Sequence, residues 1–106
     1  MPPKSRYNFD MTGKVNYGQK VVVSIISFAT LEIRGVAGLV GKKIRTEKLG
    51  ELLNIDVYIN VLIKFSCADV AYRVQENIKR NVESMTHYKV GKVNVNVLGV
   101  SFDEGK

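Results

Sequence analysis

The sequence predicts an α+β domain: a small mixed β-sheet with two helices packed on one face, in the order β-α-β-β-α-β. Apolar residues at every second position in 55–65 indicate a long strand with one buried face. Apolar residues three or four apart in 19–34, and again in 70–85, indicate two amphipathic helices. Strands and helices alternating in this way form a sheet with its helices on one side.

The length and composition predict a single domain, since the chain has 106 residues, of which 45% are hydrophobic and 25% charged. We expect a flexible N-terminal tail at residues 1–12, the folded domain at 13–102 and a C-terminal tail at 103–106. No apolar run approaches the roughly 20 residues that cross a bilayer, and the start has no hydrophobic signal segment. One cysteine fits a reducing compartment. The sequence thus predicts a cytoplasmic protein without direct membrane insertion.

The first elements are a short strand at 14–17, which alternates polar and apolar residues, and a helix at 19–34. The helical segment is rich in β-branched residues, which favour strands, but its apolar spacing is helical. Gly35 supplies the stop after it. The apolar stripe of this helix consists of Val22, Ile25, Ile26, Ala29 and Ile33.

A glycine-rich segment follows the first helix and raises the question of phosphate binding. A phosphate loop needs G-x-x-x-x-G-K-[ST] between a strand and a helix, whereas here Val36 replaces the first glycine and Lys43 the Ser/Thr. The G-x-x-G spacing also occurs in KH domains, but their loop joins two helices and exposes basic residues, and the residues here are apolar. We therefore predict a helix stop and buried turn formed by Gly35, Gly38 and Gly41.

The second half of the domain begins with a short strand at 43–48 and a turn near Gly50, ahead of the long strand. Ser66 and Asp69 are spaced like a helix-start capping box, so the second helix begins there. The closing segment alternates valine and asparagine until the apolar phase changes at Leu98–Gly99, which predicts a β-bulge in the last strand.

The net charge of +6 comes entirely from residues 1–48, which hold nine Lys/Arg and three Asp/Glu, whereas 49–106 holds seven of each. A basic surface of this kind binds nucleic acid or an acidic partner, or is simply exposed to solvent. It supports an alternative function, a KH-like RNA- or DNA-binding module. The candidate basic patch consists of Lys42, Lys43, Arg45 and Lys48.

Residues suited to catalysis are sparse. His87, the one histidine, lies near the end of the second helix, where the helix dipole favours it. Cys67 lies at the start of that helix, so about 20 helical residues, roughly 30 Å, separate the two groups. No paired histidines, Cys-x-x-Cys or calcium-loop pattern occurs. We therefore expect no enzyme activity, no metal site and no cofactor.

The side of the long strand opposite its apolar row offers a candidate association face. A partly apolar, uncharged sheet face suits binding to a protein partner, although a half-solvated sheet has the same composition. The face consists of Tyr58, Asn60 and Leu62 with Asn94 and Asn96 of the last strand.

Three segments carry a family resemblance: GKVNYGQKVVVSIISFATLEIRGVAGL, IDVYINVLIKF and VAYRVQENIKRNVESMTHYKVGKVNVNVLGVSF. Together they span residues 13–102, and they resemble the alkaline-shock (envelope stress response) protein family of Gram-positive bacteria. The chain departs from the family at Arg34, where members often carry proline before GVAGL, and in the basic segment 42–54.

The resemblance implies a non-enzymatic scaffold or adaptor linked to cell-envelope homeostasis and stress. It implies a cytoplasmic protein that is peripheral to the membrane through a partner. The partners it implies are proteins, either membrane-anchored or further copies of the chain in a homo-oligomer, and it implies no catalytic residues.

Overall fold

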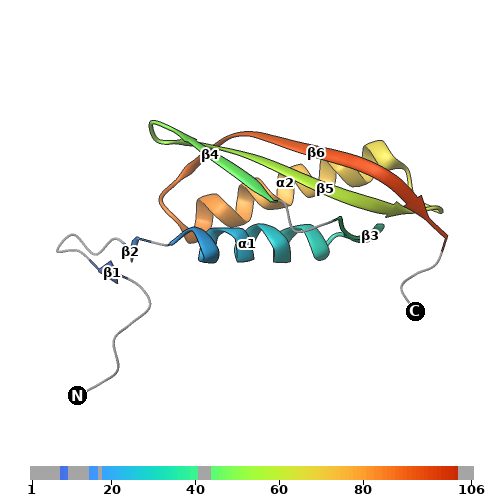
Figure 1. Ribbon diagram of the computed structural model, residues 1–106, viewed down its shortest axis with the longest axis horizontal. Helices are drawn as coiled ribbons and strands as arrows, with labels where there is room; N and C mark the ends of the chain where they lie inside the picture. The colour runs from blue at the N-terminus through green and yellow to red at the C-terminus, as the bar shows by residue number, and fades with distance from the viewer. Residues whose placement is uncertain (1–7, 10–14, 17, 41–43, 103–106) are drawn as a thin grey trace, which may run out of the picture.

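The computed structural model describes residues 8–9, 15–16, 18–40 and 44–102 (Figure 1). Two helices cover one face of a mixed sheet, so the predicted fold class is confirmed. The helices are α1 (Gln19–Leu31) and α2 (Cys67–Met85). The strands of the sheet are β3 (Val36–Leu39), β4 (Arg45–Leu49), β5 (Leu52–Leu62) and β6 (Lys89–Ser101).

The sheet is organised around β5, its central strand. β6 pairs with β5 in parallel along the whole of β5, from Leu52 to Leu62, and so fills one edge of it. β4 pairs antiparallel with the first half of β5 and β3 with the second half. Because β6 fills one edge, β3 and β4 must share the other edge, one after the other. β6 is therefore an edge strand of the sheet.

The hydrophobic core lies between β5 and the helices. Alternate residues of β5 from Leu53 to Val61 are buried, as the period-two pattern predicts. The strand ends at Leu62 rather than Phe65, because the chain turns there: the Phe65 N–H donates to the Leu62 carbonyl at 3.0 Å, and Ile63 is 47% exposed. The helices contribute Val22, Ile26, Ala29, Val70, Val74, Ile78 and Val82.

The chain start differs from the expected order of elements. The strand predicted at 14–17 occurs as β2 (Val15–Asn16), but it pairs with β1 (Asn8–Phe9) and not with the main sheet. Two residues of the predicted N-terminal tail thus form a strand. The rest of residues 1–12, and the C-terminal tail at 103–106, lie outside the described residues.

The glycine segment is only partly the turn that the sequence predicts. Gly35 is buried in a turn with φ of +101°, so it is a turn glycine. Gly38 is not: it lies in β3 opposite Asn60, and Gly41 is outside the described residues. The apolar residues between the glycines form a strand because Val36 and Leu39 pair with Val61 and Ile59 on the free edge of β5.

The last strand contains two β-bulges, each with one extra residue in β6. The bulge predicted at Leu98–Gly99 is confirmed, since Ile59 and Asn60 of β5 pair with Val97 and Gly99. A second bulge lies between Val90 and Val93, which pair with Leu53 and Ile55. There the Asn54 side chain accepts the Lys92 N–H at 2.9 Å and so completes the interrupted ladder.

The start of α2 confirms the predicted N-cap. The Ser66 hydroxyl accepts the Asp69 backbone N–H at 3.2 Å, which satisfies one of the unpaired donors of the first turn. Replacing Ser66 by alanine should lower the free energy of unfolding by about 1 kcal/mol, measured by urea denaturation. Ser84→Ala is the control, since exposed Ser84 lies inside the same helix. A loss of the same size in both variants would contradict the cap.

A candidate association face

The open face of the sheet is the side away from the helices. It consists of the alternate residues of β5 from Leu52 to Leu62 and the residues that pair with them on β3, β4 and β6. Both described helices lie on the opposite side (Figure 1). All five residues of the predicted association face lie on it: Tyr58, Asn60, Leu62, Asn94 and Asn96.

The centre of the open face is uncharged and shallow. Tyr58 lies opposite Asn96, and Asn60 lies opposite Gly99, whose missing side chain keeps this part of the face low. A Cβ at Gly99 would approach the Asn60 side-chain oxygen to 3.1 Å, so the amide covers the glycine. Tyr58 and Leu62 are half-buried, so part of each side chain is accessible to a partner. They place an aromatic ring and an aliphatic side chain among polar amides.

Hydrogen bonds fix several asparagines of the open face. The Asn96 amide donates to the Val57 carbonyl at 3.1 Å, and the Asn94 amide donates to the Asp56 carboxylate at 2.7 Å. Side chains that are already ordered lose little conformational entropy when a partner covers them. The face is thus pre-organised for contact with another surface.

The two described residues of the predicted basic patch, Arg45 and Lys48, do not share a surface. Lys42 and Lys43 lie outside the described residues, and Arg45 and Lys48 are three residues apart on β4, so they point to opposite faces of the sheet. Arg45 pairs with Asp56 of the open face. Lys48 lies on the helix side, with its ammonium 5.2 Å from the centroid of the Tyr88 ring.

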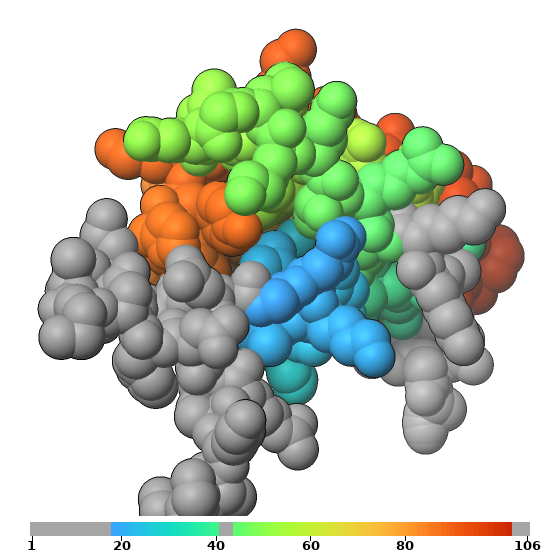
Figure 2. Space-filling view, turned by 60° about the vertical axis from the view of Figure 1, so that its left-hand side comes forward, coloured from blue at the N-terminus to red at the C-terminus, as the bar shows by residue number. Residues whose placement is uncertain are grey.

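The start of α1 packs under β4 on that same helix side. The Gln19 side chain donates to the Thr46 hydroxyl at 3.2 Å, and Figure 2 shows the blue start of the helix directly below the green hairpin. The G-x-x-G spacing of Gly35 and Gly38 joins a turn to β3 rather than two helices, so it does not form the loop of a KH domain.

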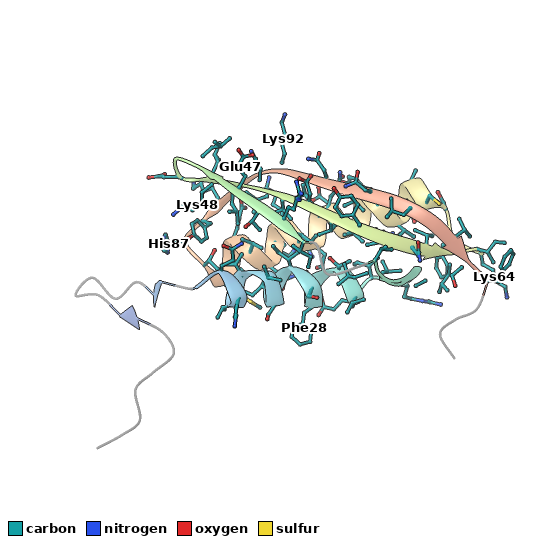
Figure 3. All side chains as sticks on the ribbon, viewed as in Figure 1. Phe28, Glu47, Lys48, Lys64, His87 and Lys92 are labelled. Atoms are coloured by element: carbon teal, nitrogen blue, oxygen red, sulfur yellow. The ribbon has the colours of Figure 1, made fainter. Side chains whose placement is uncertain are left out.

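The two candidate catalytic groups lie at opposite ends of α2. Cys67 is its first residue, and His87 lies two positions after its last residue, Met85, so the length of the 19-residue helix separates them. At about 1.5 Å per residue this is roughly 28 Å, too far for a nucleophile and its base. His87 is exposed (Figure 3). Its ring stacks on that of Tyr88 with 5.2 Å between centroids.

A groove that sequence reasoning missed runs between the end of α1 and the outer side of α2. It encloses about 830 Å³, and its three arginines are balanced by three acidic residues. Asn77 anchors it: the buried amide donates to the Ala29 carbonyl and to the Glu32 carboxylate, both at 2.8 Å. The signal in the sequence was a polar residue on the apolar stripe, three positions after Val74. The charged lining consists of Glu32, Arg34, Asp69, Arg73, Glu76 and Arg80.

Two further properties concern metals and membranes. The described parts of the chain hold no group of three or more His, Cys, Asp or Glu side chains placed to bind a metal ion. Among the helices of the described residues, none combines the length and the apolar character that crossing a membrane requires.

Residues 40–102 match the model of the alkaline shock protein 23 family, which is described by a cell envelope-related function. The chain is 31% identical over 107 residues to the uncharacterised protein YqhY of Bacillus subtilis (strain 168), covering 86% of this chain and 79% of that protein.

The fold is similar to that of MamM-CTD in solved structures. One single-residue variant of MamM-CTD gives a TM-score of 0.56 at 18% identity, covering 77% of this chain and 98% of that one. The copper form of another variant also gives a TM-score of 0.56, at 17% identity and the same coverage of 77% and 98%. At this level of identity the similarity concerns the fold.

Proposed function

Since this chain belongs to the alkaline shock protein 23 family, which has a cell envelope-related function, we propose that it is a non-enzymatic scaffold or adaptor of the cell-envelope stress response. It acts by binding a membrane-anchored protein partner or by self-association, and so stays peripheral to the membrane. The observation that carries the proposal is the pre-organised open face of the sheet, whose centre around Tyr58 is uncharged.

The composition of the open face supports binding to a protein. Aromatic side chains among polar neighbours are the usual anchors of protein interfaces, and Tyr58 is such a side chain. Its neighbour across the strands, Asn96, is held by its own hydrogen bond to the Val57 carbonyl. Tyr58 therefore serves as the anchor, and the asparagines around it supply the polar rim.

The test is co-sedimentation of the full chain with membrane vesicles prepared from its native cell. The wild type should sediment with untreated vesicles and not with vesicles stripped of exposed protein by protease. Tyr58→Ala should weaken this binding at least tenfold, as truncation of an aromatic anchor does.

The matched control is Phe28→Ala. Phe28 is 73% exposed and projects outward from α1, on the side of the molecule opposite to the open face (Figure 3). This variant should bind vesicles like the wild type. Equal binding of Tyr58→Ala and wild type, or equal binding to stripped and untreated vesicles, would overturn the proposal.

A further inference from the structure

The outer edge of β6 has no partner strand among the described residues. β6 pairs with β5 on one side only. The Val93 carbonyl accepts a hydrogen bond from the Gln75 side chain of α2 at 3.0 Å, so this residue directs its backbone away from β5. Backbone direction alternates along a strand, and Val95 and Val97 therefore also present N–H and C=O groups outward. Such groups are a template for another strand.

The sequence of this edge is nearly palindromic about Val95. From Val90 to Val100 it reads VGKVNVNVLGV, and the reversed order differs only by exchanging Lys92 and Leu98. Both bulges follow the same symmetry, since one lies between Val90 and Val93 and the other between Val97 and Gly99. Two antiparallel copies with Val95 facing its own counterpart would therefore bend at matching positions.

That register also pairs chemically compatible side chains. Val93 lies opposite Val97 on the helix side, and Asn94 lies opposite Asn96 on the open face, where two amides can exchange hydrogen bonds. Lys92 lies opposite Leu98 of the other copy, and Leu98 is 59% exposed. The two Lys92 side chains are six strand positions apart, about 20 Å, which exceeds the screening length of about 8 Å at physiological salt. No like charges therefore oppose each other.

The helix beside this edge leaves room for a second copy. Glu83 accepts the Val90 N–H and Gln75 donates to Val93, so α2 runs in the opposite direction to β6. Ala71, one turn before Gln75, therefore lies towards Val95, where its small side chain allows a second α2 to approach. Lys79, one turn after Gln75, lies away from the symmetry axis.

We propose that two copies of this chain associate through their β6 edges, antiparallel and with a twofold axis at Val95. The two sheets become one, with the two described helices of each copy on one face and a doubled open face on the other. The inference rests on the proposed scaffold and names its partner as a second copy. It is an isologous contact, which closes on itself as a dimer.

The register is tested by disulfide formation in a Cys67→Ala background. In the proposed pair Asn94 and Asn96 of the two copies have Cβ atoms about 4.5–5.5 Å apart, close to disulfide geometry. A mixture of Asn94→Cys and Asn96→Cys should form covalent dimers at least tenfold faster than either variant alone. No cross-linking in the mixture, or equal cross-linking in the single variants, would overturn this register.

The interface is tested by sedimentation equilibrium of the full chain without vesicles. The double variant Asn94→Lys/Asn96→Lys places like charges opposite each other and should raise the dimer dissociation constant at least tenfold; Asn94→Glu/Asn96→Glu should do the same. Mixing the two variants should restore dimers, which a misfolded chain would not do. A wild type that is monomeric at millimolar concentration, or charged variants that dimerise like the wild type, would overturn the inference.

The two proposals fail separately. A monomer that still binds untreated vesicles through Tyr58 removes the β6 dimer and leaves the scaffold. A charge-dependent dimer that binds no vesicles leaves the β6 dimer and removes the membrane-anchored partner of the scaffold.

Discussion

Replacing Gly35 by alanine is expected to lower the free energy of unfolding by about 3–5 kcal/mol. Gly35 has a φ of +101°, which is strained for a residue with a side chain, and a Cβ there would lie 2.7 Å from Val70 Cγ2 and 2.8 Å from the Phe65 ring. The strain and the overpacking therefore add. The measurement is the urea midpoint, with an unchanged m-value showing that stability alone has changed.

Gly50→Ala is the matched control for this prediction. Gly50 also has a positive φ, of +65°, but no atom lies within 4 Å of a Cβ built there. Only the strain of the left-handed backbone conformation remains, so the free energy of unfolding of this variant should fall by about 1–2 kcal/mol. Equal losses in the two variants would show that the contacts of Gly35 with Val70 and Phe65 do not matter.

Replacing Asn77 by aspartate is expected to cost about 3 kcal/mol or more, because it removes both donors of a buried amide. The Asn77 Nδ2 donates to the Ala29 carbonyl and to Glu32 Oε1, and its Oδ1 accepts from Arg80 at 3.3 Å. A carboxylate would face two acceptors, one of them charged, and would detach the end of α1 from α2.

The double-mutant cycle with Glu32→Gln separates these effects. A glutamine at position 32 can donate to the introduced carboxylate, so the double variant should recover about 1 kcal/mol relative to the sum of the single variants. Thermal or urea unfolding of the four chains gives the coupling. Strict additivity would mean that the Asn77–Glu32 hydrogen bond does not contribute.

The elements that could be predicted are those with an unambiguous period. Apolar residues at every second position predict β5, and apolar residues three or four positions apart predict α2. The buried residues of α2 include Val70, Val74, Ile78 and Val82. β3 could not be predicted, because it has four residues including a glycine. It forms because β4 covers only the first half of the edge of β5 and leaves the second half to be paired.

The grouping of the candidate association face was predictable, and the grouping of Arg45 with Lys48 was wrong, for the same reason. Alternate residues of a strand share a face, so Tyr58, Asn60 and Leu62 lie together. Residues three apart on a strand do not, which separates Arg45 from Lys48. The prediction treated closeness along the chain as closeness in space. The groove could not be predicted, because it is formed where the end of α1 packs against α2, and the spacing of apolar residues within each helix does not specify that packing.

Each bulge of β6 places a glycine against an asparagine side chain of β5, so the two residues of each pair constrain each other during evolution. A Cβ at Gly91 would lie 2.5 Å from the Asn54 side-chain oxygen, and one at Gly99 would lie 3.1 Å from that of Asn60. A side chain gained at either glycine requires a smaller or reoriented residue at the paired asparagine. Positions 54 and 91, and likewise 60 and 99, should therefore covary among related chains, although 37 or more residues separate the members of each pair.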